Sequence, residues 1–440
     1  MTGLPLLRAP DRVAPFACRD GYNIGVARFL GDVAALAAVL PNYEYVANIT
    51  RDRYRFAVGF AAALCRRQIT LLPPSEAAGP LCVVLGNYGS VYCLTDEPVA
   101  VQVPVFRYPE AMSRGAAPVP HFMADQPAAI LFTSGSTGLP QPHLRSWGLL
   151  VSSAISAGRE IGAAGLPGAA LIGTVPHQHS YGLESLVMLA LQHEVVLHAE
   201  RPFYAADISA RLAAARRPRI LVTTPIHLRL LLAEADALPE ADLVLSATAS
   251  LPTDLARNAE ARFAAPLYEI YGCSEVGQLA FRRTTDGDTW RCLDGIALRH
   301  ESGATWAGGA AIGVGAPLAD HIELHDPRHF SLVGRNTDIV NIGGKRSSLA
   351  HLNALLNAVE GVRDGAFVIV DAAGPRGSRL IAFAVAPGRA EGAILKALRR
   401  QIDPAFLPRP LHLVDRLPRD ALGKLTHDTV AHLLATAGRR

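Results

Sequence analysis

The chain has 440 residues, of which 50% are hydrophobic and 18% are charged, and its formal net charge is +3. This length exceeds what one hydrophobic core usually serves, so we expect at least two domains. The near-neutral charge balance gives no reason to expect nucleic acid as a partner. No apolar run reaches the ~18 residues that span a bilayer, and the amino terminus does not resemble a signal peptide. We therefore expect a cytoplasmic protein without membrane insertion.

Six cysteines are scattered along the chain without a CxxC pair. Their spacing argues against a disulfide framework and against a structural zinc site. We expect reduced thiols that are mostly buried.

The first 125 residues are expected to belong to the same large domain as the segment that follows them. Two helices are predicted at residues 26–40 and 53–67, where alanine and other apolar residues are abundant. A short apolar run at residues 81–85 is interpreted as a strand.

From about residue 128 to residue 271, short apolar runs alternate with longer helix-like stretches, a pattern that predicts a parallel α/β sheet. The predicted strands lie at residues 128–132, 169–175, 220–223, 243–246 and 267–271. Crossover helices are predicted at residues 225–237 and 252–263, and the second opens with a proline, which is tolerated in a first helical turn.

Residues 282–315 are dense in Gly, Thr and Asp, which predicts a loop-rich segment ahead of a strand at 321–324. Beyond residue 334 the pattern becomes that of a small α+β module. Its predicted elements are a helix at 349–359, strands at 366–370 and 380–386, a helix at 391–401 and a strand at 411–414. Residues 338–440 carry 15 Lys and Arg against 9 Asp and Glu, so this module is basic.

The strand at 128–132 runs into a loop made of glycine and hydroxyl residues, namely Thr133, Ser134, Gly135, Ser136, Thr137 and Gly138. Backbone N–H groups and hydroxyls in such a loop can surround phosphate oxygens. The loop is not the GxxxxGK[ST] loop of P-loop NTPases. Loops of this composition also often serve only to turn the chain, so by itself the segment leaves both interpretations open.

Six further segments follow the loop TSGSTGLP: PHQHSYG at 176–182, SATASLP at 246–252, YGCSE at 271–275, Asp320 with Arg335 fifteen residues later, GGKR at 343–346, and LPRDALGK at 417–424. In kind and order they resemble the motifs of the adenylate-forming (ANL) superfamily, which includes acyl- and aryl-CoA synthetases, luciferases and adenylation domains of peptide synthetases. The resemblance covers roughly the last three-quarters of the chain. It implies an α/β fold, with a large N-terminal domain of α/β subdomains at 1–336 and a small mobile C-terminal α+β domain at 337–440.

The resemblance also implies a site for ATP, with the phosphates held by the loop at 133–138. The residues implied to contact the adenine and the ribose are Ala249, Tyr271, Gly272, Ser274, Asp320 and Arg335. Asp320 can accept hydrogen bonds from both ribose hydroxyls while Arg335 donates to the same sugar. An exposed ion pair between these two residues is the alternative.

Two charged residues are implied to be catalytic, because joining a carboxylate to a phosphate requires neutralising two anions. Glu275 is expected to bind Mg²⁺, and Lys424 to bring a mobile cation to the carboxylate and α-phosphate oxygens. The alternatives are a carboxylate at a helix N-terminus for Glu275 and a solvated surface lysine for Lys424.

The segment PHQHSYG is similar to the family's segment beside the acid pocket, and His179 is its candidate catalytic residue. A positioning role is favoured over that of a general base, because a carboxylate at neutral pH needs no deprotonation. A hydrogen-bonded loop histidine is the alternative, and His177 is a competing candidate. Tyr181, Ala247 and Cys273 are expected to line the pocket.

The family's second step passes the acyl group to a phosphopantetheine thiol, and a glycine at Gly344 is implied to leave room for the pantetheine arm. The thiol can belong to coenzyme A or to an acyl carrier protein. A basic C-terminal module suits an acidic carrier and equally suits the phosphates of coenzyme A.

Several positions depart from the family pattern. Gln141 stands where a lysine usually follows the phosphate loop, and Arg145 is the candidate replacement for the lost cation. Ala247 and Thr248 replace two glycines along the adenine, and Thr337 stands at a hinge position that is usually Asp or Lys.

The short chain and the segment GKRSSLAHLN at 344–353 resemble the AMP-ligases of aryl polyene and xanthomonadin-type pigment biosynthesis. That resemblance implies an aryl acid such as 4-hydroxybenzoate as substrate and a carrier protein as acceptor. We therefore predict an ATP- and Mg²⁺-dependent, AMP-forming acid–thiol ligase for an aromatic acid. A fatty acyl or other acyl-CoA synthetase and a degenerate, non-catalytic nucleotide-binding protein are the alternatives.

Overall fold

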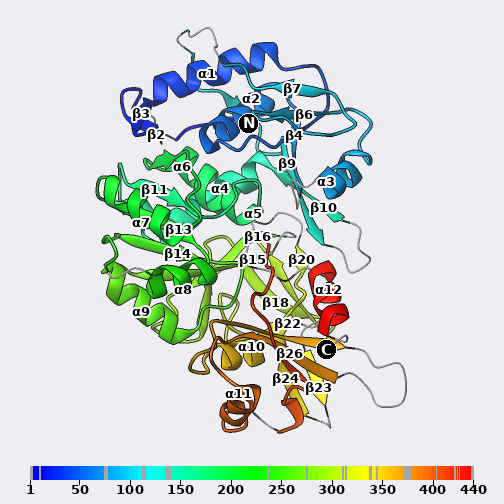
Figure 1. Cartoon of the computed structure of the whole chain (residues 1–440). Helices are drawn as coiled ribbons and strands as arrows, with labels where there is room; N and C mark the ends of the chain where they lie inside the picture. Colours follow the sequence, from blue (N-terminus) through cyan, green and yellow to red (C-terminus); the bar gives the residue numbers. More distant parts are fainter. Residues whose placement is uncertain are drawn as a thin grey trace.

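The computed structural model describes residues 3–8, 11–73, 78–110, 115, 117–134, 140–234, 237–273, 276–309, 312, 315–335, 339–342, 345–370, 379–402, 404–420, 423, 425 and 427–437. Figure 1 shows three tiers: N-terminal helices and strands at one end, a second sheet with its helices in the middle, and the C-terminal strands and helices at the other end. No helix within these described residues is both long and apolar enough to cross a membrane.

The N-terminal tier is built on a six-stranded sheet in the order β10-β9-β5-β4-β6-β7. Its strands are β4 (Tyr45–Asn48), β5 (Ile69–Leu72), β6 (Val91–Thr95), β7 (Val105–Arg107), β9 (Pro127–Ser134) and β10 (Pro140–Ser146). Neighbouring strands are parallel except for β9 and β10, which form an antiparallel hairpin. The same tier contains α1 (Val26–Val39), α2 (Arg53–Cys65), α3 (Ala78–Leu85) and the short pair β1 (Leu4–Pro5) and β8 (His121–Phe122).

The middle tier is built on an eleven-stranded sheet in the order β21-β22-β17-β16-β15-β14-β13-β11-β12-β2-β3. Its strands are β2 (Pro15–Arg19), β3 (Tyr22–Gly25), β11 (Ala170–Gly173), β12 (Val196–His198), β13 (Arg219–Thr223), β14 (Leu243–Ser246), β15 (Leu267–Cys273), β16 (Gly277–Arg282), β17 (Thr289–Cys292), β21 (Asp320–Leu324) and β22 (His329–Arg335). The six strands from β15 to β2 in this order are parallel. A small antiparallel sheet lies beside them, formed by β18 (Ala297–Glu301), β19 (Ala304–Gly308) and β20 (Ala316–Pro317).

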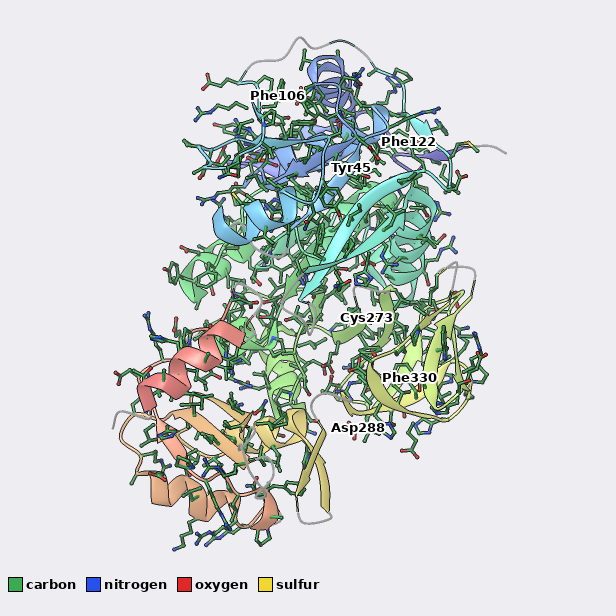
Figure 2. The ribbon with its side chains drawn as sticks, turned by 90° about the vertical axis from the view of Figure 1, so that its right-hand side faces the viewer. Tyr45, Phe106, Phe122, Cys273, Asp288 and Phe330 are labelled. Atoms are coloured by element: carbon green, nitrogen blue, oxygen red, sulfur yellow. The ribbon has the colours of Figure 1, made fainter. Side chains whose placement is uncertain are left out.

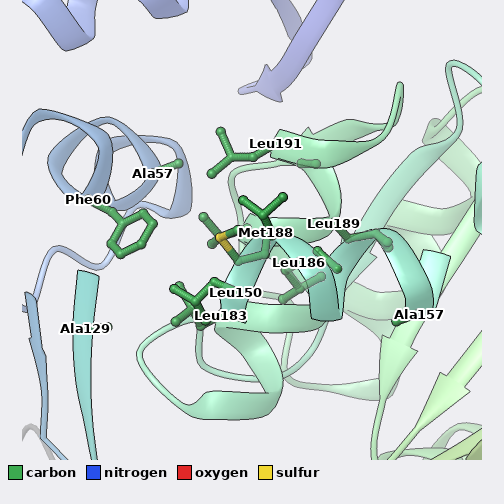
Figure 3. Packing of buried hydrophobic residues seen from close by; sticks show 14 of the residues in the cluster. Ala57, Phe60, Ala129, Leu150, Ala157, Leu183, Leu186, Met188, Leu189 and Leu191 are labelled. Atoms are coloured by element: carbon green, nitrogen blue, oxygen red, sulfur yellow. The ribbon is translucent and has the colours of Figure 1, made fainter. Parts of the chain in front are cut away.

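Helical segments cover both faces of the parallel strands, which explains why these strands are apolar at nearly every position. One face carries α7 (Ala205–Ala214), α8 (Pro225–Glu234) and α9 (Thr253–Phe263). The other face carries α2, α4 (Trp147–Glu160), the 3₁₀ turn Ala163–Gly165, α5 (Ser180–Gly182), a π-helical turn (Leu183–Met188) and α6 (Leu189–Gln192). In β13, Leu221 packs in the first of these two cores, whereas Ile220 and Val222 pack in the second. Figure 3 shows Phe60 of α2 and Leu150 of α4 among the side chains that surround Met188.

The C-terminal tier contains the hairpin of β23 (Ile339–Ile342) and β24 (Lys345–Ser348), and a three-stranded sheet of β25 (Asp364–Val370), β26 (Arg379–Val385) and β27 (Leu411–Leu413). Its helices are α10 (Leu349–Asn357), α11 (Glu391–Leu398), the 3₁₀ turn Pro404–Phe406 and α12 (His427–Ala437). Among the described residues, the two hydrophobic clusters of this tier contain only side chains from Leu349 onward. A division into domains at 1–336 and 337–440 stays a prediction.

The α/β fold predicted from the sequence is confirmed. Each of the five predicted strands between residues 128 and 271 is present, and the strand at 243–246 has the predicted bounds. The predicted crossover helices correspond to α8 and α9, and the predicted order of elements in the C-terminal module is the order observed.

Three expectations are wrong. Residues 81–85 are helical rather than extended: Leu81, Val84 and Leu85 are buried whereas Val83 is 50% exposed, which is the spacing of a helix face. Residues 282–315 contain β17, β18 and β19, and their Gly, Thr and Asp residues form the turns between short strands. All six cysteines are free, as expected, but only Cys93 and Cys292 are buried.

Candidate active site

The candidate site lies where the parallel strands of the middle sheet end. The carboxyl ends of parallel strands meet at one edge of a sheet, and loops from neighbouring strands therefore converge there. Thr174, directly after β11, has its hydroxyl oxygen 3.0 Å from that of Thr223 at the end of β13. Ala247 follows β14, and Cys273 ends β15. The sequence segments PHQHSYG, SATASLP and YGCSE all begin at or near this edge.

Tyr271 and Asp320 are in direct contact. The Tyr271 hydroxyl donates a hydrogen bond of 2.5 Å to a carboxylate oxygen of Asp320. The Tyr271 ring lies edge-on to Trp290 and Phe330, with ring centroids 5.7 and 5.8 Å away. Asp320 is directly opposite Arg335 in the register of β21 and β22. A separation of fifteen residues along the chain thus becomes a cross-strand pair, which brings the two implied ribose-binding positions together.

A close backbone approach requires the glycine at position 272. A Cβ atom there would lie 2.4 Å from the carbonyl oxygen of Gly277, on the antiparallel strand β16. The neighbouring Cys273 is half-buried at the end of β15. Figure 2 shows Cys273 between the level of the β9–β10 hairpin above and Phe330 below. The motif YGC therefore combines three features. The Tyr271 hydroxyl contacts Asp320, Gly272 allows the neighbouring strand to approach closely, and Cys273 places a small side chain at the end of the strand.

The loop after β14 is strained at one residue and anchored at another. Thr248 has a φ of +79°, which is unfavourable for a β-branched residue and occurs where the family pattern has glycine. Leu251 donates its backbone N–H to the Glu269 carboxylate at 3.0 Å. Glu269 is buried on β15 and also pairs with Arg282 at 2.7 Å. Ala247 is 5% exposed, so its side chain is largely covered by protein.

The loop after β11 has a fixed geometry around His179. The His179 Nδ1 atom accepts a hydrogen bond from the backbone N–H of Tyr181 at 3.3 Å, so the ring caps the short helix that follows. A Cβ atom on Gly182 would lie 1.9 Å from the carbonyl oxygen of Pro176, which explains the glycine of the P-x-x-H-x-x-G segment. Tyr181 is 6% exposed, and burial raises the pKa of its hydroxyl, which therefore stays protonated.

His177, the competing candidate, is a buried structural residue. Its Nε2 atom lies 2.8 Å from the carbonyl oxygen of Thr50, and its ring packs against Phe56 with centroids 4.6 Å apart. Burial, together with the charge of Arg53, lowers the His177 pKa to about 3. Gln178 donates its amide to the same Thr50 carbonyl at 3.0 Å. Both side chains tie the loop after β11 to the N-terminal tier.

Arg53 fixes the same loop through hydrogen bonds to its backbone. It is fully buried as the first residue of α2, and its guanidinium donates to four backbone carbonyls at 2.7 to 3.4 Å, those of Gly173, Val175, His198 and Glu200. Burial lowers the Arg53 pKa to about 9. One side chain thus links the loops after β11 and β12.

The strands β9 and β10 flank the loop that is expected to bind the phosphates, and they place Gln141 opposite Thr133 and Pro140 opposite Ser134. Arg145, the candidate replacement cation, lies on β10, and its role toward the phosphates stays a prediction. Arg145 is 4% exposed, and a Cβ atom on Gly277 would lie within 3.2 Å of both its guanidinium and the Glu184 carboxylate. Glu184 also accepts hydrogen bonds from Ser153 and Ser180 and from the Gln278 backbone.

Several predicted site residues lie outside the described residues, namely Gly135, Ser136, Thr137, Gly138, Ser274, Glu275, Thr337, Gly344 and Lys424. Only backbone pairing is described for Thr133, Ser134 and Arg335. Gly423, directly before Lys424, lies against α8, since a Cβ atom on it would be 3.0 Å from Ile226. The described part of the chain contains no group of three or more His, Cys, Asp or Glu residues that could hold a metal ion.

Three of the buried charged residues that escaped the sequence analysis support the loops described above: Arg53, Glu184 and Glu269. Glu184 and Glu269 each stand among mostly apolar residues, and charged side chains are rarely buried without partners, so sequence inspection could have singled them out without revealing those partners. Arg53 lies between Arg51, Asp52 and Arg55, and no local signal distinguishes it from these charged neighbours.

The architecture is shared with solved structures. Over 97% of this chain and 96% of the other, the structure aligns with crystalline ATP-bound MatB from Rhodopseudomonas palustris at a TM-score of 0.82 and 20% sequence identity. At this identity the likeness concerns the fold, which is that of the adenylate-forming (ANL) enzymes.

The sequence comparisons are more specific. Residues 77–305 match the family model described as AMP-binding enzyme. A 4-coumarate–CoA ligase of Rhodobacter capsulatus is 31% identical over 62% of this chain and 67% of its own length. A probable 2-succinylbenzoate–CoA ligase of Mycobacterium tuberculosis is 30% identical over 71% of this chain and 85% of its own length. The chain belongs to the AMP-binding enzyme family.

Proposed function

We propose that this protein activates an aromatic carboxylic acid with ATP as an acyl-adenylate and then transfers the acyl group to a phosphopantetheine thiol. The observation that carries the proposal is the hydrogen bond between Tyr271 and Asp320, with Arg335 opposite Asp320 in register, at the strand-end edge of an AMP-binding enzyme. An aromatic residue hydrogen-bonded to a carboxylate, with an arginine at the position opposite that carboxylate in the sheet, suits an adenine and its ribose.

In the first step, a carboxylate oxygen of the acid attacks the α-phosphorus of ATP, and the bond to pyrophosphate breaks. We assign the phosphates to the loop at 133–138, Mg²⁺ to Glu275, and the neutralising cation to Lys424, all by resemblance to the family. Gly423, against α8, supports the assignment of Lys424, because it brings this part of the chain close to a helix that follows β13.

For the acid, we propose a pocket formed by His179, Tyr181, Ala247 and Cys273, with an aryl acid similar to 4-hydroxybenzoate as substrate. The named substrates of the two relatives, 4-coumarate and 2-succinylbenzoate, are both aryl acids. His179 caps a helix through Nδ1, which supports a positioning role rather than that of a general base. The resemblance to pigment-cluster AMP-ligases supports 4-hydroxybenzoate in particular.

In the second step, the thiol attacks the acyl carbonyl and AMP leaves, with Gly344 beside the pantetheine arm. Coenzyme A as acceptor is supported by the names of the relatives. An acyl carrier protein is supported by the resemblance to pigment-cluster AMP-ligases, whereas the basic balance at 338–440, 15 Lys and Arg against 9 Asp and Glu, suits both acceptors. A cytoplasmic location, expected from the sequence, completes the proposal.

Acid-dependent exchange of pyrophosphate into ATP tests the first step directly. We expect exchange with 4-hydroxybenzoate and other aryl acids and little with fatty acids, whereas exchange that requires long-chain acids would favour a fatty acyl-CoA synthetase. Lys424→Ala should lower exchange by a factor of 10² to 10³, the scale of a lost transition-state cation. Lys396→Ala, on α11, is the matched control. No exchange with any acid would favour a non-catalytic nucleotide-binding protein.

A further inference from the structure

An ion pair in the C-terminal tier contacts the chain directly before Lys424. The Arg419 guanidinium donates to both carboxylate oxygens of Asp364, on β25, through Nε and one terminal nitrogen, at 2.8 Å each. Its other terminal nitrogen donates to the carbonyl oxygen of Gly423 at 2.9 Å. Gly423 is the residue that precedes Lys424. One arginine side chain thus connects β25 to the backbone next to the proposed catalytic lysine.

The geometry of this pair suits a positioning contact. Two parallel hydrogen bonds to one carboxylate fix the plane of the guanidinium, so its third nitrogen points in a defined direction. The side chains of Arg419 and Asp364 are only 19% and 17% exposed, and water and salt therefore screen the pair less than a surface pair. The Gly423 backbone N–H also donates to the Asp420 carbonyl at 2.9 Å. Gly423 is therefore held through both its N–H and its carbonyl.

Two contacts join this part of the C-terminal tier to α8 of the middle tier. A Cβ atom on Gly423 would lie 3.0 Å from Ile226. Arg229, which is half-buried, donates to the side-chain oxygen of Asn357, at the end of α10, at 3.4 Å. Ile226 and Arg229 are three residues apart, so they lie on the same face of α8. Because α8 follows β13, whose carboxyl end lies at the edge of the candidate site, these contacts place Gly423 relative to that edge.

Asn357 connects Arg229 to the strand that carries Asp364. Its amide nitrogen donates to the carbonyl oxygen of Gly365, the residue after Asp364, at 2.9 Å, and to that of Asn353 at 2.8 Å. The amide oxygen is therefore left to accept from Arg229. Burial lowers the pKa of Arg229, and the nearby charge of Asp364 opposes this shift. Hydrogen bonds and backbone thus link α8 to Gly423 through β25.

Direct binding of substrate phosphates by Arg419 is the alternative role, since arginine is well suited to that task. The observed contacts oppose it, because Nε and both terminal nitrogens of Arg419 already donate to protein oxygens. A purely structural ion pair is the other alternative. Such a pair would affect the stability of the C-terminal tier without any particular effect at Lys424.

We infer that Arg419, oriented by Asp364, is a positioning residue for Lys424, because it fixes the Gly423 carbonyl and thereby the point at which the chain continues into the lysine. This inference rests on the first step proposed above, in which Lys424 supplies the neutralising cation. It adds that the cation depends on an ion pair that does not itself contact the substrate.

Cleavage of the full-length protein by a lysine-specific endoproteinase tests the contact without any reaction. The chain has three lysines, Lys345, Lys396 and Lys424, so each cut can be assigned by mass. Cleavage reports the population of locally opened chain, and Arg419→Ala should raise the rate after Lys424 about tenfold while the rate after Lys396, on α11, changes less than about twofold. An unchanged rate at Lys424, or equal increases at the two lysines, would overturn the inference.

Pyrophosphate exchange tests the consequence for catalysis. Arg419→Ala should lower the maximal exchange rate about tenfold, because a small displacement of a catalytic group is costly. KM for ATP and for the acid should change little, because the described contacts of Arg419 all lie within the C-terminal tier. In a Lys424→Ala background the same substitution should have almost no further effect, since residues that act as a unit are not additive. A further tenfold loss in that background would show that Arg419 acts independently of Lys424.

Two more variants complete the test. Asp364→Asn keeps the shape of the side chain and removes the ion pair, so it should change both readouts in the same direction even if Arg419→Ala does not fold. Arg416→Ala removes an exposed arginine three residues before Arg419 and, as the matched control, should change neither. If the unaltered protein shows no exchange with any acid, the proposed function fails, and the ratio of cleavage rates alone decides whether Arg419 fixes this part of the chain.

Discussion

Two loops at the same edge of the middle sheet are held in different ways. The loop after β14, proposed to lie along the adenine, is anchored by Glu269 from the neighbouring strand β15. The loop after β11, proposed to adjoin the acid, is anchored by Arg53 and by the carbonyl of Thr50, both from the N-terminal tier. The loop proposed for the nucleotide is thus fixed within one sheet, whereas the loop proposed for the acid depends on contacts between two tiers.

This difference indicates that the two halves of the site can be perturbed separately. A change at Glu269 should affect ATP before it affects the acid, because its partner Leu251 lies in the loop proposed to run along the adenine. A change at Arg53 should affect the acid before it affects ATP. The residue with the strained backbone, Thr248, lies in the loop after β14, which is the loop proposed to run along the adenine.

The largest effect is expected for Arg53→Leu. The substitution leaves four buried carbonyls without their donor, and disruption of such a buried charged network typically costs about 4 kcal/mol of unfolding free energy. Urea unfolding measures this loss, and KM for the acid in pyrophosphate exchange should rise more than KM for ATP. Arg66→Ala, an exposed arginine just after α2, is the control. A loss below about 1 kcal/mol in Arg53→Leu would show that the tiers do not depend on this residue.

The next effect is expected for Glu269→Gln, which keeps the shape of the side chain and removes its charge. Breaking the buried pair with Arg282 should cost about 3 kcal/mol. KM for ATP should rise while KM for the acid changes little. Glu301→Gln removes a carboxylate from an exposed pair with Arg299 and should be neutral. Equal increases in the two KM values would contradict the separation of the two loops.

Acidification should lower the free energy of unfolding through protonation of His177, in the loop after β11. Its folded pKa of about 3 lies below the ordinary value of 6.5, so the unfolded chain binds the proton more readily between these values. Stability is therefore lost as the pH falls below about 6.5, and this group alone should remove about 2 kcal/mol between pH 7 and pH 5. Unfolding by urea at both pH values should show a loss smaller by that amount in His177→Gln. An identical pH dependence in the two proteins would rule out this origin.

The smallest effect is expected for Thr248→Gly. Glycine relieves the positive φ of 79° at a cost in backbone entropy, so the net gain in unfolding free energy should be about 0.5 kcal/mol. Ala249→Gly, at a neighbouring position without positive φ, should instead destabilise the protein. Thermal unfolding of both variants tests the prediction, and destabilisation by Thr248→Gly would mean that the threonine side chain contributes contacts larger than the strain.

Much of the fold could be predicted from local patterns. The parallel strands β11, β13 and β14 are apolar at consecutive positions because helices cover both of their faces, and that signal is local. The helix at Ala78–Leu85 was mistaken for a strand because an apolar run of five residues does not distinguish the two structures. For the site, motif order alone indicated Tyr271, Asp320 and Arg335, and the structure places all three together.

The sequence by itself determined the α/β class, the order of the elements and the membership of a family, because these depend on periodicity and on motifs whose residues are close in the chain. Only the tertiary structure revealed that Arg53 supports the loop after β11, that Arg145 lies beside Glu184, and that His177 and Gln178 line a cavity with Arg51 and Arg201. The physical reason is separation: these partners are 23 to 150 residues apart, and nothing local specifies which buried charge meets which carbonyl or cavity.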